Sequence, residues 1–512
     1  MKIRTLPQLI AHWAKTQPKK LAVDDGLTTF SYAELYQRAN NYAQQLIDHG
    51  VQPHDCVLLT LPKSSEAIAA ILGTLMCGAC YVPVDVKAPK ERLMAMIEDA
   101  AVSVCIGRLP QLTDHEDLLH CVELNSLANV DLKPVNLYQN DVKGDAYLLY
   151  TSGSTGVPNG VRISHRAMLS FFSAVNSYMG VSRFSRCMST SALYFDVSII
   201  DTLLPLYQGA SVWLGSDMPM PLRYVHLLTE HQITHMCAVG STLNVLASLP
   251  GFKSNQWPAL SSIMTGAEIL NPNTMQQWLS VAPNGQIFNG YGPTEVTCVS
   301  TIFTITSDNV DKYSAFPIGQ PIPGIEIHIQ NDNATDTGEL WLAGPQVMNG
   351  YLNRETLNQK RLVEHEGIRF YRTGDRVRRT STGELLFLGR LDDETKVRGY
   401  RIHLDDVAEP FRALNDIRDA HACKLNHPDF SECIAMALLA TNDVIQVDQL
   451  VTACNKLPAY MRPKQFIQFE RFPLKPSGKV DVKLLRQQVE RLALQTNETH
   501  ISKPEMTEAS QT

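Results

Sequence analysis

The sequence lacks the features that mark nucleic-acid-binding and disulfide-stabilised proteins. The formal net charge is −7, so no excess of basic residues is available to hold a nucleic acid. The 11 cysteines are odd in number and scattered along the chain, which argues against a framework of paired disulfides. Cys77 and Cys80 form a C-x-x-C, but no second such pair or histidine cluster follows at zinc spacing. We expect both to be buried free thiols.

Long unbroken apolar runs are also missing. Residues 67–84 carry no charge, but Gly73, Gly78 and Pro83 interrupt them, and the pattern indicates a buried helix followed by a strand. Residues 1–20 lack the apolar core and the small-residue cleavage site of a signal peptide. These absences predict a soluble, cytoplasmic protein without membrane insertion, and we expect it to be a monomer.

What the chain does contain is typical of a folded protein with more than one domain. Its 512 residues, 44% hydrophobic and 19% charged, are too many for one ordinary core. To about residue 300, apolar runs of strand length alternate with helical patterns, which predicts an α/β fold of layered, largely parallel sheets. Short strands with Gly and Pro turns follow. We predict a large domain over 1–389 with a β-rich subdomain over 318–389, a small α+β domain over 390–496 and a disordered tail over 497–512.

A loop rich in Gly, Ser and Thr follows the apolar strand that ends near Tyr150. The small residues of this loop, 151–160, let a backbone approach a polyphosphate closely, and its hydroxyl and N–H groups donate hydrogen bonds. A helical pattern begins after it, as in sites that bind anions at a helix N-terminus, whereas the alternative is a plain surface loop. The spacing is not that of a P-loop NTPase, because no Gly-Lys is followed by Ser or Thr, here or at Gly478-Lys479-Val480.

Several segments together resemble a known family. The loop resembles the signature of the acyl-adenylate-forming superfamily, which includes acyl-CoA synthetases, luciferases and the adenylation domains of nonribosomal peptide synthetases. The chain as a whole looks most like the stand-alone D-alanine–carrier protein ligases. The resemblance implies a small C-terminal domain that rotates between two reactions. Further segments resemble the motifs of the family in the same order: CGACYVPVD (77–85), NGYGPTE (289–295), YRTGD (371–375), GRLD (389–392) and PSGKVD (476–481).

The resemblance implies ATP and Mg²⁺ as cofactors and gives roles to individual residues. Adenylation joins two anions, so their charge must be neutralised and their geometry fixed. Glu295 would hold Mg²⁺, Tyr291 would lie against the adenine, and Asp375 would accept hydrogen bonds from both ribose hydroxyls. Lys479 would bridge the substrate carboxylate and the α-phosphate, and Thr151 and Glu295 complete the implied catalytic set. The implied nucleotide site comprises Thr151, Ser152, Gly153, Ser154, Thr155, Gly156, Asn289, Gly290, Tyr291, Thr294, Asp375, Arg390 and Lys479.

The same resemblance makes Asp392 the hinge between the two domains, where a plain interdomain linker is the alternative. The chain departs from the family pattern at a few positions. Asn159 stands where the phosphate loop has Lys, which removes a charge and leaves the backbone cradle. His403 and Asp406 stand where the family has Glu, at positions that affect how the small domain docks.

The segment at residues 195–200 resembles the one that opens the acyl pocket in amino-acid-activating members. There an Asp, here Asp196, pairs with the α-ammonium group of the substrate, and we expect it to lie in an apolar strand; an N-cap or surface Asp is the alternative. No other implied pocket residue is charged, which predicts a neutral side chain, and Gly266 and Gly290 are expected to open space. The implied pocket residues are Asp196, Val197, Ile200, Cys237, Met264, Gly266, Gly290, Cys298 and Val299.

These features predict an ATP-dependent amino acid–carrier protein ligase. It would convert a small neutral amino acid to aminoacyl-AMP and transfer it to the phosphopantetheine thiol of a separate carrier protein, because no Gly-Gly-x-Ser carrier site follows Lys479. Glycine or alanine is the leading substrate. Gly266 stands where the D-alanine ligases have Cys, so proline, valine and larger apolar amino acids remain open. The alternatives are an acyl- or aryl-CoA ligase of the same superfamily and an inactive binding protein on this fold.

Overall fold

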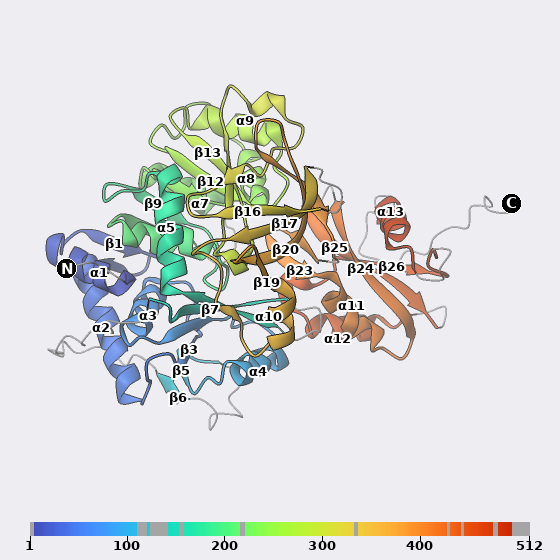
Figure 1. Cartoon of the computed structure of the whole chain (residues 1–512), viewed down its shortest axis with the longest axis horizontal. Coiled ribbons are helices and arrows are strands. Elements are labelled where there is room, and N and C mark those ends of the chain that lie inside the picture. Colours follow the sequence, from blue (N-terminus) through green and yellow to red (C-terminus); the bar gives the residue numbers. More distant parts are fainter. Residues whose placement is uncertain are drawn as a thin grey trace. The chain divides into compact units, whose positions relative to one another are not determined.

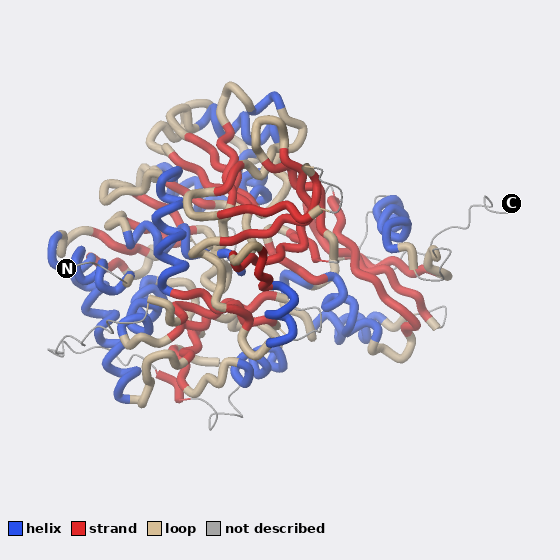
Figure 2. Tube along the Cα trace, in the orientation of Figure 1, coloured by secondary structure: helices blue, strands red, loops and turns tan. Residues whose placement is uncertain are grey.

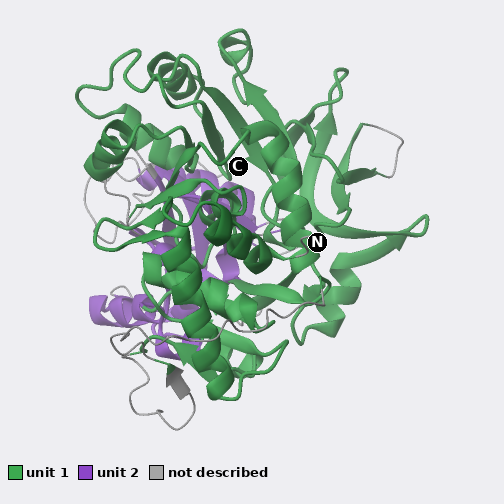
Figure 3. Ribbon diagram, turned by 90° about the vertical axis from the view of Figure 1, so that its left-hand side faces the viewer, with its two compact units in different colours: residues 1–86, 94–150, 159–391 green, residues 87–93, 151–158, 392–512 purple. Residues whose placement is uncertain are grey.

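The computed structural model describes residues 5–109, 120–122, 142–152, 158–215, 221–331, 336–392, 394–427, 431–441, 445–474 and 480–493. The chain divides into two compact units, shown in Figure 3. The first comprises residues 1–86, 94–150 and 159–391, and the second comprises 87–93, 151–158 and 392–512. The short segments 87–93 and 151–158 belong to the second unit through space, a grouping that the order of residues in the sequence does not reveal.

The first unit contains a large sheet whose order is β15-β14-β13-β12-β11-β9-β10-β1-β2. Each strand from β13 to β1 is parallel to its neighbour, while β2, β14 and β15 are antiparallel. The parallel part confirms the α/β layer predicted from the alternating pattern. The bounds in that order are Gln320–Pro321, Thr301–Ile305, Gln286–Tyr291, Ser262–Gly266, His235–Cys237, Arg186–Ser189, Ser211–Leu214, Leu21–Asp24 and Thr29–Ser31.

A second sheet has the order β18-β8-β7-β4-β3-β5-β6. Its strands β7, β4, β3, β5 and β6 are parallel, and β18 runs antiparallel to β8 at the edge. The bounds in sheet order are Gly350–Tyr351, Asn159–Ser164, Asp145–Thr151, Cys80–Pro83, Cys56–Leu59, Val104–Ile106 and His120–Val122.

An antiparallel sheet forms most of the predicted β-rich stretch. It has the order β16-β17-β20-β19, and β21 also pairs with β20. Two strands of the same stretch join other sheets, because β15 pairs with β14 and β18 pairs with β8. The bounds are Glu326–Gln330 (β16), Thr337–Ala343 (β17), Leu362–His365 (β19), Ile368–Arg379 (β20) and Leu385–Arg390 (β21).

Helices connect these strands and are drawn in blue in Figure 2. Local sequence signals set several helix ends. Ser31 and Glu34 form a reciprocal capping box at the start of α2, and α5 ends at Gly180, whose φ of 67° suits glycine. The bounds are Leu6–Thr16 (α1), Tyr32–Asp48 (α2), Ser65–Met76 (α3), Lys90–Asp99 (α4), His165–Met179 (α5), Leu204–Tyr207 (α6), Pro221–Glu230 (α7), Gly240–Ala247 (α8), Pro272–Val281 (α9) and Glu355–Arg361 (α10).

Helix α3 explains the uncharged stretch at residues 67–84. All of its residues except Glu66 are buried, and β4 follows it after a turn. Gly73 lets α2 and α3 pack closely (Figure 1), since a Cβ there would lie 2.5 Å from Tyr42 Cβ and 2.6 Å from Ala39 O. This confirms a buried helix followed by a strand. Among the described residues, no helix combines the length and apolar character needed to cross a bilayer.

The second unit is built around the long hairpin of β24 and β25, with β26 parallel to β25. Side chains alternate between its faces. Ile434 and Met436 pack with α11 and α12, whereas Cys433 and Ala435 pack with α13. The bounds are Glu394–Val397 (β22), Tyr400–His403 (β23), Leu404–Arg412 (α11), Ile417–His427 (β24), Ser431–Ala440 (β25), Val447–Asn455 (α12), Gln465–Phe469 (β26) and Val482–Ala493 (α13).

Candidate active site

The Tyr-Gly-Pro-Thr-Glu segment begins at the C-terminal end of β13. Tyr291 is the last residue of that strand, and a short 3-10 helix over Thr294–Val296 follows. Thr297 and Cys298 then adopt left-handed conformations with φ of 56° and 75°, which are costly for residues other than glycine. Such strain is concentrated at functional sites in many proteins, and here it turns the chain back toward β14.

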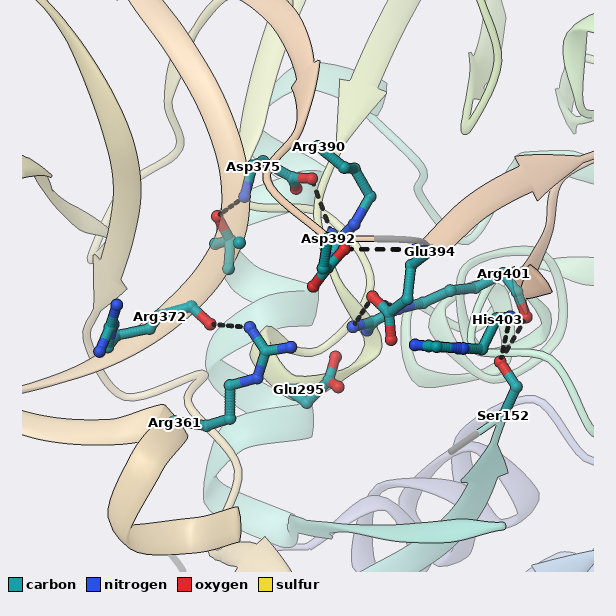
Figure 4. Close-up of polar contacts among 12 residues, drawn as sticks. Ser152, Glu295, Arg361, Arg372, Asp375, Arg390, Asp392, Glu394, Arg401 and His403 are labelled. Atoms are coloured by element: carbon teal, nitrogen blue, oxygen red, sulfur yellow. Dashed lines mark hydrogen bonds and ion pairs between the residues drawn. The ribbon is translucent and has the colours of Figure 1, made fainter. Parts of the chain in front are cut away.

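Tyr291, Asp375 and Arg390 come together although they lie far apart in the sequence. Tyr291 Oη donates to Asp375 Oδ2. Arg390 Nη1 donates to Asp375 Oδ1 at 2.7 Å (Figure 4). The β20–β21 register places Asp375 directly opposite Arg390. Burial and the Asp375 carboxylate raise the pKa of Tyr291 well above its usual value, so its phenol stays protonated and donates. Asn289, also from β13, donates through Nδ2 to Pro317 O at 2.8 Å.

Glu295 is buried, with 1% of its surface exposed. Tyr351 Oη donates to Glu295 Oε1 at 2.5 Å and lies 3.2 Å from Tyr371 Oη, so these two phenols position one carboxylate oxygen. Carboxylate oxygens are of the hard type that Mg²⁺ prefers, and a single carboxylate together with phosphate oxygens is a usual set for that ion. The donor present therefore fits Mg²⁺. The sequence did not single out Tyr351, whose position beside Glu295 depends on the pairing of β18 with β8.

Asp196 does not lie in an apolar strand, and that prediction is wrong. Residues 191–198 form turns, with Ser198 N donating to Phe195 O, and a π-helix over Ile199–Leu203 follows. Asp196 is half-buried, and Thr294 Oγ1 donates to its Oδ2 at 2.6 Å. The bond joins the expected acid-binding segment to the Gly-Pro-Thr-Glu motif through Thr294, which is also predicted to bind the nucleotide.

Further buried groups surround Asp196. Burial raises the pKa of Cys237 well above its usual value, and the charges of Asp201 and Asp196 add to the effect. The pKa of Tyr147, on β7, is also raised well above its usual value. Burial is the main cause, and the charges of Tyr81, Asp196 and Cys298 add to it. Two expected pocket residues thus interact with this group of side chains: Cys237 with the Asp196 carboxylate, and Cys298 with the Tyr147 phenol. The sequence reasoning missed Tyr147, because a tyrosine in an apolar strand is typical of an ordinary core.

Asp201, in the π-helix, has a different environment. It is 3% exposed, and its carboxylate accepts from Ser189 Oγ at 2.9 Å, Thr190 N at 2.8 Å and Ser191 N at 2.9 Å. Burial raises its pKa, while the charge of Lys63 and these hydrogen bonds oppose the rise. Its partners close the turn between β9 and the π-helix, so Asp201 fixes the backbone that leads through Asp196.

Gly266 and Gly290 face each other across β12 and β13. A Cβ at Gly266 would lie 2.0 Å from Gly290 O, so the expectation that Gly266 opens space is wrong: the side-chain position is filled by backbone. A Cβ at Gly290 would meet Met264 Sδ and Val299 Cγ2, each at 3.1 Å. Gly290, Met264 and Val299 therefore lie together. Ile200 is buried in the π-helix, and Val197 is half-buried before it.

Much of the expected phosphate loop lies outside the described residues, including Gly153, Ser154, Thr155 and Gly156. The expected catalytic Lys479 also lies outside them. Thr151 ends β7, and Ser152 after it is buried. Ser152 Oγ donates to Arg401 O at 3.1 Å and accepts from His403 N at 3.2 Å, within the second unit (Figure 4).

The expected hinge residue Asp392 is the first residue of the second unit after Leu391. Its Oδ1 accepts from Glu394 N at 3.3 Å, and Glu394 pairs with Arg401 at 2.7 Å. His403 Nδ1 lies 3.9 Å from Asp406 Oδ1. His403 and Asp406, two of the three residues that depart from the family pattern, are thus neighbours at the start of α11.

The fold and these motifs define an adenylate-forming enzyme. Residues 10–352 match the AMP-binding enzyme family, and the chain belongs to that family. Enzymes of this family use ATP. The fold of this chain is that of a solved NRPS protein containing adenylation and PCP domains. The TM-score is 0.83 and the identity 24%, and the match covers 94% of this chain and 84% of that one. The o-succinylbenzoate CoA synthetase of Bacillus subtilis has the same fold, with a TM-score of 0.81, 21% identity, and coverage of 95% and 98%.

Among proteins of known activity, the chain is similar to parts of large peptide synthetases. It is 32% identical to one of the plipastatin synthase subunits of Bacillus subtilis (strain 168) over 510 residues, which covers 93% of this chain and 14% of that protein. It is 30% identical to gramicidin S synthase 2 of Aneurinibacillus migulanus over 490 residues, covering 94% and 11%. The chain thus spans a small part of the length of these relatives.

Proposed function

We propose that this protein is an ATP-dependent amino acid–carrier protein ligase. It activates a small neutral amino acid, glycine or alanine in the first instance, as aminoacyl-AMP with release of pyrophosphate. It then transfers the aminoacyl group to the phosphopantetheine thiol of a separate carrier protein. The similarity to peptide synthetases and the polar groups around Tyr291 and Asp196 support this proposal.

The observation that carries the proposal is the position of Asp196. Its half-buried carboxylate is held by Thr294 within the Gly-Pro-Thr-Glu motif, and its charge reaches the buried Cys237 and Tyr147. A carboxylate in such surroundings favours a cationic ligand, because a charge in a low-dielectric site interacts strongly with its partner. The α-ammonium group of an amino acid is a partner of this kind, whereas a fatty or aryl acid brings no positive charge.

The packing around Gly290 supports a small side chain. Met264 and Val299 already lie within contact of the position that a methyl group on Gly290 would take, and Gly266 adds no room. The expected pocket residues are uncharged apart from Asp196, so the substrate side chain is expected to be neutral. Glycine and alanine satisfy both conditions, and proline or valine would require Met264 or Val299 to move.

The nucleotide would be held by groups from β13, β20 and β21. Each oxygen of Asp375 accepts one of the bonds from Tyr291 and Arg390 and has the capacity to accept another, so the carboxylate is able to accept from the ribose hydroxyls. Glu295 would ligate Mg²⁺, which neutralises phosphate charge when bound. Lys479 would stabilise the charge that moves between the carboxylate and the α-phosphate. Asp392 would allow the second unit to turn between adenylation and thiol transfer.

The test is ATP–pyrophosphate exchange measured with each amino acid and with several fatty and aryl acids. We expect exchange with one or a few neutral amino acids, with glycine or alanine giving the highest kcat/KM. Exchange with a fatty or aryl acid alone would reject the role given to Asp196. Lys479→Ala should abolish exchange with every acid while circular dichroism and the melting temperature stay unchanged.

The acceptor is tested separately with purified aminoacyl-AMP-forming enzyme. We expect a phosphopantetheinylated carrier protein to receive the radiolabelled amino acid, and coenzyme A to receive none. Loading of coenzyme A at an equal rate would identify the protein as an acyl-CoA ligase. No exchange with any acid, in protein that binds ATP, would favour an inactive binding protein.

A further inference from the structure

Two cysteines begin neighbouring strands at the same end of the second sheet. Cys56 is the first residue of β3 and Cys80 is the first residue of β4, and the parallel register pairs them directly. Backbone bonds hold the strand starts together, because Cys80 N donates to Asp55 O at 2.8 Å and His54 N donates to Gly78 O at 2.8 Å. The position is independent of the proposed acid pocket, which uses residues of other strands.

The spacing of the two strands suits a disulfide. Neighbouring strands lie about 4.8 Å apart, and disulfides join residues whose Cα atoms are roughly 4.4 to 6.8 Å apart. Both cysteines are at strand starts, and the parallel register places them side by side. The bond would therefore need mainly a change of the side-chain torsions.

The two thiols also differ in the way that a reactive pair requires. The interaction between the two thiols shifts their pKa values in opposite directions, and Cys56 is half-buried while Cys80 is 2% exposed. The interaction with the Cys80 thiol lowers the pKa of Cys56, against burial and the charges of Asp145 and Asp55, and the Arg162 guanidinium also lowers it. Arg162 in turn pairs with Asp145 at 2.7 Å. The same interaction and burial raise the pKa of Cys80.

We propose that Cys56 and Cys80 form a peroxide-sensitive dithiol that closes into an intramolecular disulfide. The Cys56 thiolate attacks one oxygen of hydrogen peroxide, the O–O bond breaks, and hydroxide leaves as Cys56 becomes a sulfenic acid. Cys80 loses its proton and attacks the Cys56 sulfur, so that an S–S bond forms, the S–O bond breaks and water leaves. The two thiols are oxidised together, and one peroxide is reduced to two waters.

Other cysteines of the chain provide matched controls. Cys77, which belongs to the C-x-x-C, donates to Ala43 O at 3.3 Å and Gly73 O at 3.4 Å, and burial raises its pKa to about 12. Burial also raises the pKa of Cys454, which is half-buried on α12. The C-x-x-C spacing is therefore not the reactive pair: Cys80 is matched with Cys56 across the sheet and not with its neighbour in the sequence.

The experiment treats the full chain with a small excess of hydrogen peroxide, blocks remaining thiols with N-ethylmaleimide and maps non-reduced peptides by mass spectrometry. We expect a peptide pair linked through Cys56 and Cys80, removed by dithiothreitol, absent from Cys56→Ser and retained in Cys77→Ser. In Cys80→Ala, dimedone should trap the sulfenic acid on Cys56 about tenfold faster than any product on Cys77.

Two outcomes would overturn the proposal. The first is a linked peptide that joins Cys56 to another cysteine, or Cys77 to Cys80, as the main product. The second is oxidation of Cys77 or Cys454 ahead of Cys56 in the wild-type protein. If Cys80→Ala is poorly folded, the wild-type peptide map and Cys77→Ser decide the matter by themselves.

Discussion

Asp196 and Asp201 are separated by one turn of chain, yet they have different roles in the molecule. Asp201 is enclosed and takes its hydrogen bonds from Ser189, Thr190 and Ser191, all within the same short stretch. Asp196 is half-buried and is held by Thr294, 98 residues further along the chain. The first carboxylate is satisfied locally and fixes the backbone. The second is held from a distant motif, as expected of a group that also serves a ligand.

The difference shows how a buried acid is recognised as structural or functional. Exposure alone does not separate the two cleanly, because Asp201 is buried and Asp196 is half-buried. The source of the hydrogen bonds does. Partners from the adjoining turn stabilise that turn, whereas a partner from a separate motif couples two parts of the site, as expected where substrate and nucleotide must meet.

Replacing Asp196 should produce the largest effect on activity and almost none on stability. We expect Asp196→Asn to lower kcat/KM for the amino acid about 100- to 1000-fold, since removing one partner of a buried charge pair costs roughly 3 to 4 kcal/mol. Pyrophosphate exchange measures the loss and urea denaturation the stability. A large loss of stability with normal KM would show that Asp196 is a second structural acid.

Replacing Asp201 should do the reverse. We expect Asp201→Asn to lower the free energy of unfolding by about 2 kcal/mol, because an amide N–H replaces one of the two buried oxygens that accept hydrogen bonds and leaves a donor facing donors. Urea denaturation measures this change, and exchange per folded molecule should stay near the wild-type value. Unchanged stability would remove the contrast between the two residues.

Thr294 tests whether the distant bond matters. Thr294→Val keeps the shape of the side chain and removes the donor to Asp196, so we expect KM for the amino acid to rise about tenfold, the equivalent of a hydrogen bond of about 1.4 kcal/mol to a charged group. KM for ATP serves as the internal reference, and Thr294→Ser should restore most of the loss. An equal rise in both KM values would assign Thr294 to the nucleotide instead.

The pH dependence of stability provides the finest test. Burial raises the pKa of Asp201 above 3.8, so the folded protein holds its proton to a higher pH than the unfolded chain does. Its contribution to stability is therefore fully present below pH 3.8 and falls as the pH rises through the folded pKa. The difference in unfolding free energy between wild type and Asp201→Asn should decrease over that window. A difference that grows with pH would mean that the hydrogen bonds outweigh burial.

The sequence predicted the α/β layers well, because alternating apolar and helical patterns are local signals. It also predicted that residues 67–84 form a buried helix and a strand, since the glycines and proline punctuate the run. It failed at residues 195–200, where a short apolar run fits a strand or a helix equally well and periodicity cannot separate them. The structure has turns and a π-helix there.

The contacts within the site were less accessible to sequence reasoning. Tyr351 reaches Glu295 only because β18 crosses to the second sheet, and Thr294 reaches Asp196 from another strand end. Neither pairing has a local signal. Gly266 was expected to create volume, but its consequence depends on the carbonyl of Gly290 on the adjacent strand. Residue types could be interpreted from the sequence, and their partners could not.

The close approach of Gly266 to Gly290 limits how this enzyme could acquire a new substrate. Any side chain at 266 would push the carbonyl of Gly290 and with it the strand that ends in Tyr291. A mutation there would disturb Tyr291, which we propose contacts the nucleotide, before it altered the choice of acid. Laboratory evolution toward bulkier acids should therefore accumulate changes at Met264 and Val299, whose side chains face Gly290 and leave that main chain in place.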